Sequence, residues 1–157
     1  QVASQAFSHE SSFQQHTACD EGYDADVAVD PTGKLLAFTS EKLEYQSGQD
    51  LCKQGEAGDA MFVIMTGEAD VIINTPGGEH VVARMGKNSF VGEIAILCDV
   101  PRTATVRAKD RLSALRISKE LFFRLVGEFP QMAVEIMREL AHRLDKTTKD
   151  LAKAKAA

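Results

Sequence analysis

The pattern of hydrophobic and polar positions changes twice along the chain, and each change marks a different kind of structure. Residues 1–33 have no regular apolar period and are rich in Gln, Ser, Asp and Ala, which is typical of a partly helical or poorly ordered arm. From Tyr45 to Ile117, short apolar runs alternate with glycines at the spacing of a strand and its turn. After Ser118 the apolar period lengthens to about 3.6 residues, which predicts helices.

The short apolar runs in the middle of the chain predict individual strands. They cover residues 61–65, 71–73, 80–83, 104–108 and 112–117. Pro76-Gly77-Gly78 separates two of these runs and predicts a hairpin turn between them. Many short strands joined by glycine turns indicate a closed β-roll, or jelly roll, rather than an open sheet.

Two helices are expected after the roll. Ser118 is a suitable N-cap, and Glu120 suits the positive end of a helix. We expect this helix to end near Pro130 and a second to run from about Gln131 to Lys153. The second helix carries a short coiled-coil seam, with apolar and small residues at spacings of four and three. The seam residues are Ala133, Met137, Leu140, Leu144, Thr147, Leu151 and Ala154.

These patterns divide the chain into three parts. They are an acidic, Gln/Ser-rich N-terminal arm over residues 1–33, the β-roll domain over residues 34–130, and a C-terminal lid or dimerisation helix over residues 131–157.

The distribution of charge along the chain limits the kinds of ligand that it can bind. The formal net charge is −5, but residues 1–33 hold six carboxylates and neither Lys nor Arg, so the remainder is nearly neutral. Nucleic-acid binding needs a basic face, and this chain offers none. One small anionic ligand stays possible, because a single arginine can bind it. No apolar run approaches the roughly 20 residues of a membrane segment.

Cysteine and histidine usage argues against a disulfide framework, a metal site and enzymatic chemistry. The three cysteines include no CxxC pair, and the four histidines show neither HxH nor HxxxH spacing. We therefore expect reduced thiols in a cytoplasmic protein, no metal, no cofactor and no catalytic residue.

The most informative segment runs from Phe90 to Val106. Gly92 permits close backbone approach, and Glu93 can begin a short helical turn whose N–H groups face an anion. Arg102, nine positions after Glu93, can meet a phosphate with two parallel charge-assisted bonds. A carboxylate beside a phosphate suits a neutral hydroxyl such as that of a ribose. The same pair also fits a structural ion pair between Glu93 and Arg102.

A family resemblance favours the ligand. The segment resembles the phosphate-binding cassette of the cyclic-nucleotide-binding domain family, here Gly92-Glu93-Ile94-Ala95-Ile96 followed by Pro101-Arg102-Thr103-Ala104-Thr105-Val106. Upstream, the glycine-rich segment from Gln54 to Gly67 resembles the strand-turn-strand that opens the roll in this family. The resemblance covers residues 43–150 and implies a mainly β fold with flanking helices, an eight-stranded β-roll followed by two C-terminal helices.

The resemblance also implies a role for each cassette residue. Glu93 accepts the ribose 2′-hydroxyl, and Arg102 pairs with the cyclic phosphate. The backbone N–H groups of Ile94, Ala95 and Ala104 complete the phosphate cradle, while Gly92 allows the close approach. Three further residues are candidates for lining the pocket, although core packing explains each of them too. They are Val71, Val82 and Phe90.

Three hydroxyl residues bear on which base is bound. Thr103 resembles the residue of cGMP-binding domains that reaches the guanine amino group, but many bacterial cAMP binders carry a hydroxyl there too. Thr147 and Thr148 resemble the adjacent hydroxyl pair that contacts adenine in the bacterial catabolite activator. Thr147 is equally well explained as a tolerated polar residue of the seam. The choice between cAMP and cGMP is left open, with cAMP favoured.

The sequence thus predicts a non-enzymatic regulatory module that binds a cyclic nucleotide and relays binding through its C-terminal helix. We expect a homodimer through that helix, an unidentified effector domain or protein, no nucleic-acid contact within this chain and no membrane segment. Two alternatives remain: the sensor half of a transcription factor without its DNA-binding part, and a sensor of the same fold for another small effector.

Overall fold

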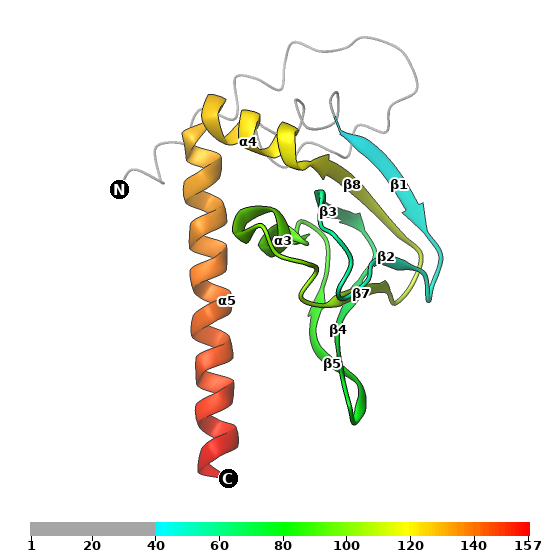
Figure 1. Ribbon diagram of the computed structural model, residues 1–157, viewed down its shortest axis with the longest axis vertical. Coiled ribbons are helices and arrows are strands. Elements are labelled where there is room, and N and C mark those ends of the chain that lie inside the picture. The colour runs from blue at the N-terminus through cyan, green and yellow to red at the C-terminus, as the bar shows by residue number, and fades with distance from the viewer. Residues whose placement is uncertain (1–39) are drawn as a thin grey trace. The chain divides into compact units, whose positions relative to one another are not determined.

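The computed structural model describes residues 40–157 (Figure 1). The expected N-terminal arm, together with Cys19 and the two histidines within it, lies outside the described residues. The chain divides after Lys119 into two compact units, a β-roll and a helical unit. Each unit is considered by itself, and the domain limits expected from the sequence stay predictions.

The roll is built from two antiparallel four-stranded sheets. One sheet has the order β1-β8-β3-β6 and the other β2-β7-β4-β5, which confirms the β-roll with C-terminal helices. The strands are β1 (Glu41–Tyr45), β2 (Asp50–Cys52), β3 (Ala60–Thr66), β4 (Ala69–Thr75), β5 (Gly78–Met85), β6 (Phe90–Val91), β7 (Thr105–Ala108) and β8 (Leu112–Ser118). A short helix, α3 (Glu93–Cys98), lies between β6 and β7.

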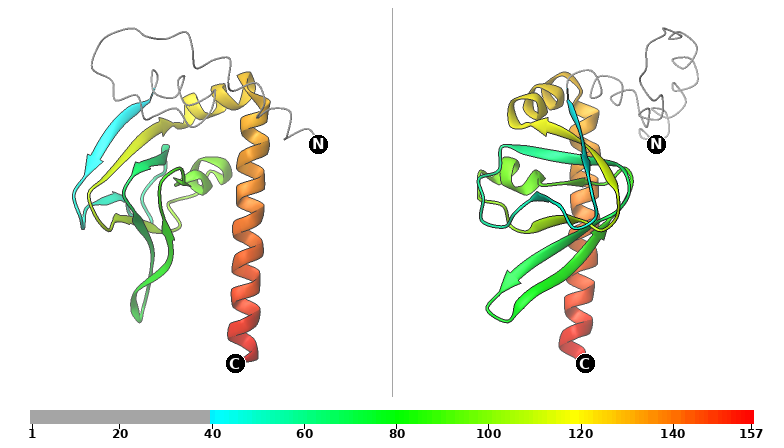
Figure 2. Two further views of the ribbon diagram at one scale, coloured as in Figure 1. Left: turned by 180° about the vertical axis from the view of Figure 1, so that it is seen from behind. Right: turned by 90° about the vertical axis from the view of Figure 1, so that its right-hand side faces the viewer.

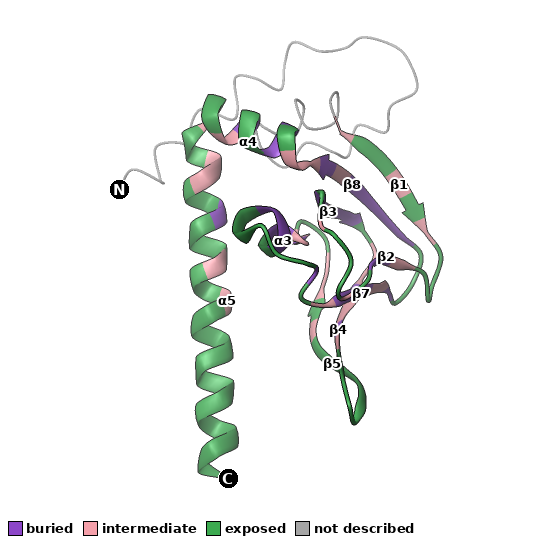
Figure 3. Ribbon diagram, viewed as in Figure 1, coloured by how far each residue is buried: buried purple, intermediate pink, exposed green. Residues whose placement is uncertain are grey.

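Burial differs strongly between the strands (Figure 3). β3 and β8 lie next to each other inside the first sheet, and most of their residues are buried. β5 lies at the edge of the second sheet, and none of its residues is buried. The core between the sheets is apolar and includes Phe62, Ile64, Val91, Val106 and Leu112. Burying such side chains, at about 1.5–3 kcal/mol each, is the main stabilisation of the roll.

The hairpin predicted at Pro76-Gly77-Gly78 is present. Thr75 and Gly78 are paired, so Pro76 and Gly77 form the turn between β4 and β5. Both strands are longer than the apolar runs suggested, because polar residues extend the ladder towards an exposed tip. The hairpin projects beyond the rest of the roll in every view (Figures 1 and 2).

The helical unit contains the two helices expected after the roll. α4 (Lys119–Glu128) begins directly where β8 ends, and α5 (Pro130–Ala156) follows one residue after α4. Pro130 starts α5 because its missing N–H needs no partner in the first turn of a helix. α5 extends through Ala156, slightly beyond the expected end, and is largely exposed (Figure 3).

Candidate functional site

Gly92 has the backbone geometry that the cassette requires. It is the N-cap residue of α3, with φ 83° and ψ 4° in the left-handed region that favours glycine. A Cβ atom at this position would lie 2.5 Å from Nη1 of Arg102 and 3.4 Å from the carbonyl oxygen of Ala60. The left-handed φ therefore favours glycine here, and a Cβ would displace the guanidinium of Arg102.

Arg102 lies inside the site, with only 6% of its surface exposed. Its Nη1 donates a hydrogen bond of 2.9 Å to the carbonyl oxygen of Gly92. Its guanidinium carbon lies 5.8 Å from the ring centroid of Phe62 on β3, within cation–π range. A guanidinium has five N–H donors, so Arg102 has the capacity to bind a phosphate as well.

The backbone of Arg102 is held by the turn between β2 and β3. Its N–H donates to the carbonyl of Glu56, and its carbonyl accepts from the N–H of Gly55, each at 2.8 Å. In the same turn, a Cβ at Gly58 would lie 3.3 Å from the guanidinium of Arg102 and would overlap the methyl of Ala95 on α3. The turn is thus packed directly against the cassette.

The other cassette residues differ in exposure. Glu93 and Ala95, on α3, are each 3% exposed, whereas Ile94 is 42% exposed. Thr103 is exposed and Ala104 is half-buried. The structure therefore brings Gly92, Glu93, Ala95 and Arg102 together at the start of α3.

The three candidate lining residues lie on strands of the roll. Val71 and Phe90 are half-buried, and Val82 is 54% exposed on β5. Val71 pairs with Ala83, and the register then shifts so that Ile72 pairs with Val81. Val82 lies at this irregular step, on an edge strand where no residue is buried.

Thr147 and Thr148 belong to the helical unit. Their hydroxyls donate to the carbonyls of Arg143 and Leu144 at 2.8 and 2.9 Å, within α5 itself. Both residues are exposed. Such bonds to the residue four positions earlier are a common way for a helix to accommodate threonine.

Burial and charge both act on Cys52, which lies in the core beside the site. Loss of solvation raises the pKa of its thiol, and the positive charge of Arg102 works in the opposite direction. Cys52 and Cys98 are both free thiols. Within residues 40–157, no cluster of His, Cys, Asp and Glu side chains could hold a metal ion. No helix in that range is long and apolar enough to cross a membrane.

Sequence reasoning missed several residues that shape the site. Gly58 and Gln54 lie within the upstream glycine-rich motif, but nothing in their spacing showed that this turn packs on Arg102. Phe62 was expected only as part of a strand, because a ring beneath a guanidinium leaves no pattern in the chain. A long-range contact of this kind is visible only once the strands are paired.

The fold is a two-sheet β-roll in which the backbone at the start of α3 is bonded to the buried Arg102. Residues 42–129, more than half of the chain, match the family model described as the cyclic nucleotide-binding domain. The chain belongs to this family.

The relatives found by sequence are regulatory proteins. The chain is 38% identical over 93 residues to the cAMP-dependent protein kinase regulatory subunit of Blastocladiella emersonii, covering 59% of this chain and 23% of that protein. It is 41% identical over 91 residues to the same subunit of Yarrowia lipolytica, covering 58% of this chain and 23% of that protein. The chain thus spans less than a quarter of the length of these relatives.

Two solved structures share the fold. The catabolite activator protein of Thermus thermophilus superposes with a TM-score of 0.71 at 24% identity, covering 79% of this chain and 59% of that one. The regulatory subunit of a cAMP-independent protein kinase A from Trypanosoma brucei gives a TM-score of 0.60 at 26% identity, covering 70% and 41%.

Proposed function

We propose that this chain is a non-enzymatic regulatory module that binds a cyclic nucleotide, with cAMP favoured over cGMP. The observation that carries the proposal is Arg102, a cation 6% exposed and oriented by a bond to Gly92. A buried charge is costly unless a partner compensates it, and a cyclic phosphate is such a partner. The names of the relatives support cAMP, and the cytoplasmic location stays a prediction.

In this proposal each cassette residue has one task. Arg102 pairs with the phosphate, and Glu93 accepts a hydrogen bond from the ribose 2′-hydroxyl. The N–H groups of Ile94, Ala95 and Ala104 face the phosphate oxygens. Thr103 would meet the base, and Val71, Val82 and Phe90 would line the pocket.

The proposal is tested by calorimetric titration of nucleotide-free protein with cAMP and cGMP. We expect micromolar or tighter binding, which is about −8 kcal/mol. Arg102→Ala should weaken it by about 2–5 kcal/mol, because the phosphate loses its cationic partner. Arg111→Ala is a suitable control, since the side chain of Arg111 is 75% exposed and forms an ion pair with the exposed Glu44. Binding of Arg102→Ala within threefold of wild type would show that the phosphate lies elsewhere.

Glu93 is tested through the sugar. Glu93→Gln should weaken binding by about 1.5–3 kcal/mol, less than the arginine change, because one charge-assisted bond is lost. A 2′-deoxy cyclic nucleotide should lose little further affinity in this variant. Additive losses would mean that Glu93 does not contact the ribose.

The C-terminal helix would relay binding and pair two chains. α5 is 27 residues long, and Met137, Leu144 and Leu151 of the seam are 60%, 68% and 54% exposed. A helix with an exposed apolar stripe gains stability by packing against a partner. A parallel homodimer, with the nucleotide favouring one position of the helix, would use this stripe.

A substitution at Thr147 tests both the dimer and the contact with the base. Thr147→Leu should tighten the dimer, because a polar seam residue is replaced by an apolar one. If its hydroxyl also serves adenine, the same change should weaken cAMP binding more than cGMP binding. Sedimentation velocity with saturating nucleotide measures the dimer. A monomer at tens of micromolar would contradict the dimer. The apolar stripe would then be interpreted as an intramolecular lid.

A sensor of another small effector is the second candidate. The regulatory subunit from Trypanosoma brucei is described as part of a cAMP-independent kinase and is 26% identical to this chain. The titration separates the two functions: no heat and no change in melting temperature with either cyclic nucleotide would favour the other effector.

A further inference from the structure

In the second sheet, β7 lies beside β4 but does not extend along its whole length. β4 and β7 are paired from Ala69 opposite Ala108 to Ile72 opposite Thr105, where the pairing ends. Continued by two residues, the same register would bring Thr103 opposite Asn74. Instead, β7 begins only at Thr105, and the backbone of Arg102 bonds to Gly55 and Glu56. The backbone of β4 at Asn74 therefore has no partner on β7.

The side chain of Gln54 occupies the place that the strand has left. The N–H of Asn74 donates to Oε1 of Gln54 at 2.7 Å, and Nε2 of Gln54 donates to the carbonyl of Asn74 at 3.4 Å. One side-chain amide therefore reproduces the pair of bonds that a neighbouring strand would make. At this exposed position the amide pairs both backbone groups of Asn74, where residue 103 would have stood in a longer β7.

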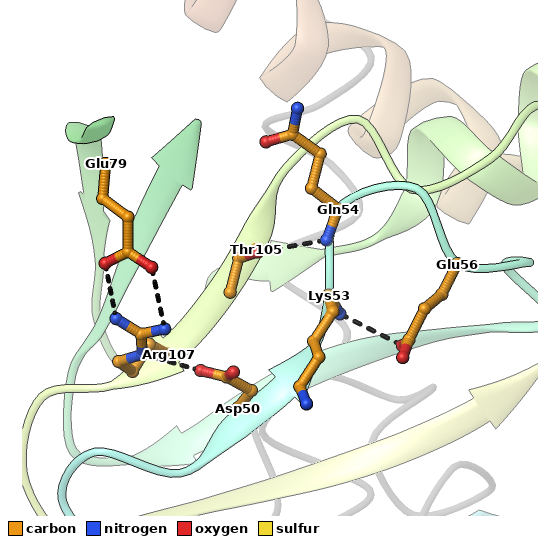
Figure 4. A network of polar contacts seen from close by, with 7 residues as sticks. All are labelled: Asp50, Lys53, Gln54, Glu56, Glu79, Thr105 and Arg107. Carbon is orange, nitrogen blue, oxygen red and sulfur yellow. Dashed lines mark hydrogen bonds and ion pairs between the residues drawn. The ribbon is translucent and has the colours of Figure 1, made fainter. Parts of the chain in front are cut away.

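Gln54 also belongs to the turn between β2 and β3 that is hydrogen-bonded to the backbone of Arg102. Its own N–H donates to Oγ1 of Thr105 at 3.0 Å, and Thr105 is 3% exposed (Figure 4). The next two residues, Gly55 and Glu56, make the two backbone bonds of 2.8 Å to Arg102. A continuous series of contacts thus runs from the edge of β4 through Gln54 to the backbone of Arg102.

We propose that Gln54 is a positioning residue for Arg102: it closes the edge of β4 and thereby fixes the turn that sets the direction of the guanidinium. It need not touch the ligand. This inference rests on the proposed function, because Arg102 is taken to bind the phosphate. Its effect on the side chain of Arg102 is nevertheless a property of the nucleotide-free protein.

A matched control lies in the same sheet. Arg107 binds Asp50 on β2 at 2.7 Å and Glu79 on β5 at 2.9 Å, as Figure 4 shows. Glu79→Gln weakens this cross-strand network without removing any bond of the turn. A general loosening of the sheet would affect both variants, whereas a positioning role is specific to Gln54.

The test uses Gln54→Met, which keeps the length of the side chain and removes its amide. The Nε–H signal of Arg102, assigned by its loss in Arg102→Lys, is followed by NMR without nucleotide. We expect Gln54→Met to shift or broaden this signal and to weaken cAMP binding about tenfold, the effect of a lost hydrogen bond. Glu79→Gln should leave both unchanged.

The double variant separates positioning from general destabilisation. In an Arg102→Ala background, Gln54→Met should change the affinity by less than about twofold, because coupled residues are non-additive. An equal loss in both backgrounds, or an unmoved Arg102 signal, would overturn the inference. If wild type fails to bind, the proposed function fails, and the NMR signal still decides the role of Gln54. Should Gln54→Met not fold, Thr105→Val, which removes the acceptor for the main-chain N–H of Gln54, tests the link from Gln54 to β7 with the same two measurements.

Discussion

Replacing Gly58 by alanine should show how tightly the turn packs against the cassette. The added methyl would overlap the Cβ of Ala95 and lie 3.3 Å from the guanidinium of Arg102. Ala95 is 3% exposed on α3, and its methyl has no other rotamer to adopt. The turn or α3 must therefore shift, and overpacking by one methyl costs about 1–3 kcal/mol.

This cost can be measured in two ways. At about 2–4 °C per kcal/mol for a chain of this size, the melting temperature of Gly58→Ala should fall by several degrees. The affinity for cyclic nucleotide should fall by at least about tenfold, because a displaced guanidinium loses charge-assisted bonds worth about 1.5–3 kcal/mol. Scanning calorimetry and titration calorimetry on the same sample give both values.

Two further variants make the result decisive. Gly86→Ala is the control, since Gly86 has no positive φ and a Cβ there would meet no atom within 4 Å. Ala95→Gly should partly rescue Gly58→Ala by giving the new methyl the space of the old one. If Gly58→Ala melts and binds like Gly86→Ala, the close packing of turn and cassette does not exist.

Two predictions concern ionisation and thiol chemistry in the roll. The Asp99 carboxylate accepts a bond of 2.7 Å from Lys119, which holds its pKa below the ordinary value of 3.8. Such a depressed pKa stabilises the folded state above about pH 4, and the contribution is lost as the pH falls through the lowered value. Lys119→Met should raise the pKa of Asp99, measured by carboxyl NMR titration, and an unchanged pKa would refute the pairing in solution. Cys98 is exposed, whereas Cys52 is buried with a raised pKa, so iodoacetamide should label Cys98 in the native protein and Cys52 only after unfolding. Equal labelling rates, read by peptide mass spectrometry, would contradict the buried position of Cys52.

Much of the fold could be read from the sequence because it depends on local periodicity. Apolar runs of strand length predicted the positions of β3, β4, β5, β7 and β8, and Pro76-Gly77 predicted the hairpin. The change of period after Ser118 predicted α4 and α5. The ends were less well placed: β4 and β5 extend into polar residues, because the ladder continues where no side chain needs to be buried.

The candidate site could be read only in part. The sequence contains Gly92, Glu93 and Arg102 at the spacing of a cassette, and the left-handed φ of Gly92 agrees with the need for glycine. The hydroxyls of Thr147 and Thr148 were matched to a base contact by resemblance, and in the structure both bond to their own helix. That contact stays a prediction, since a helical threonine can turn its hydroxyl to another partner.

The order of the elements and the chemical groups available to the site follow from the amino-acid sequence. Tertiary structure alone decided how Arg102 is held, since Gly58, Phe62 and Gln54 lie some forty to fifty positions before it. The physical reason is that strand pairing, not local period, brings these residues together. A one-residue change in the register of a strand would exchange its two faces and so move these contacts. The hydrophobic pattern along the chain would be the same in both cases.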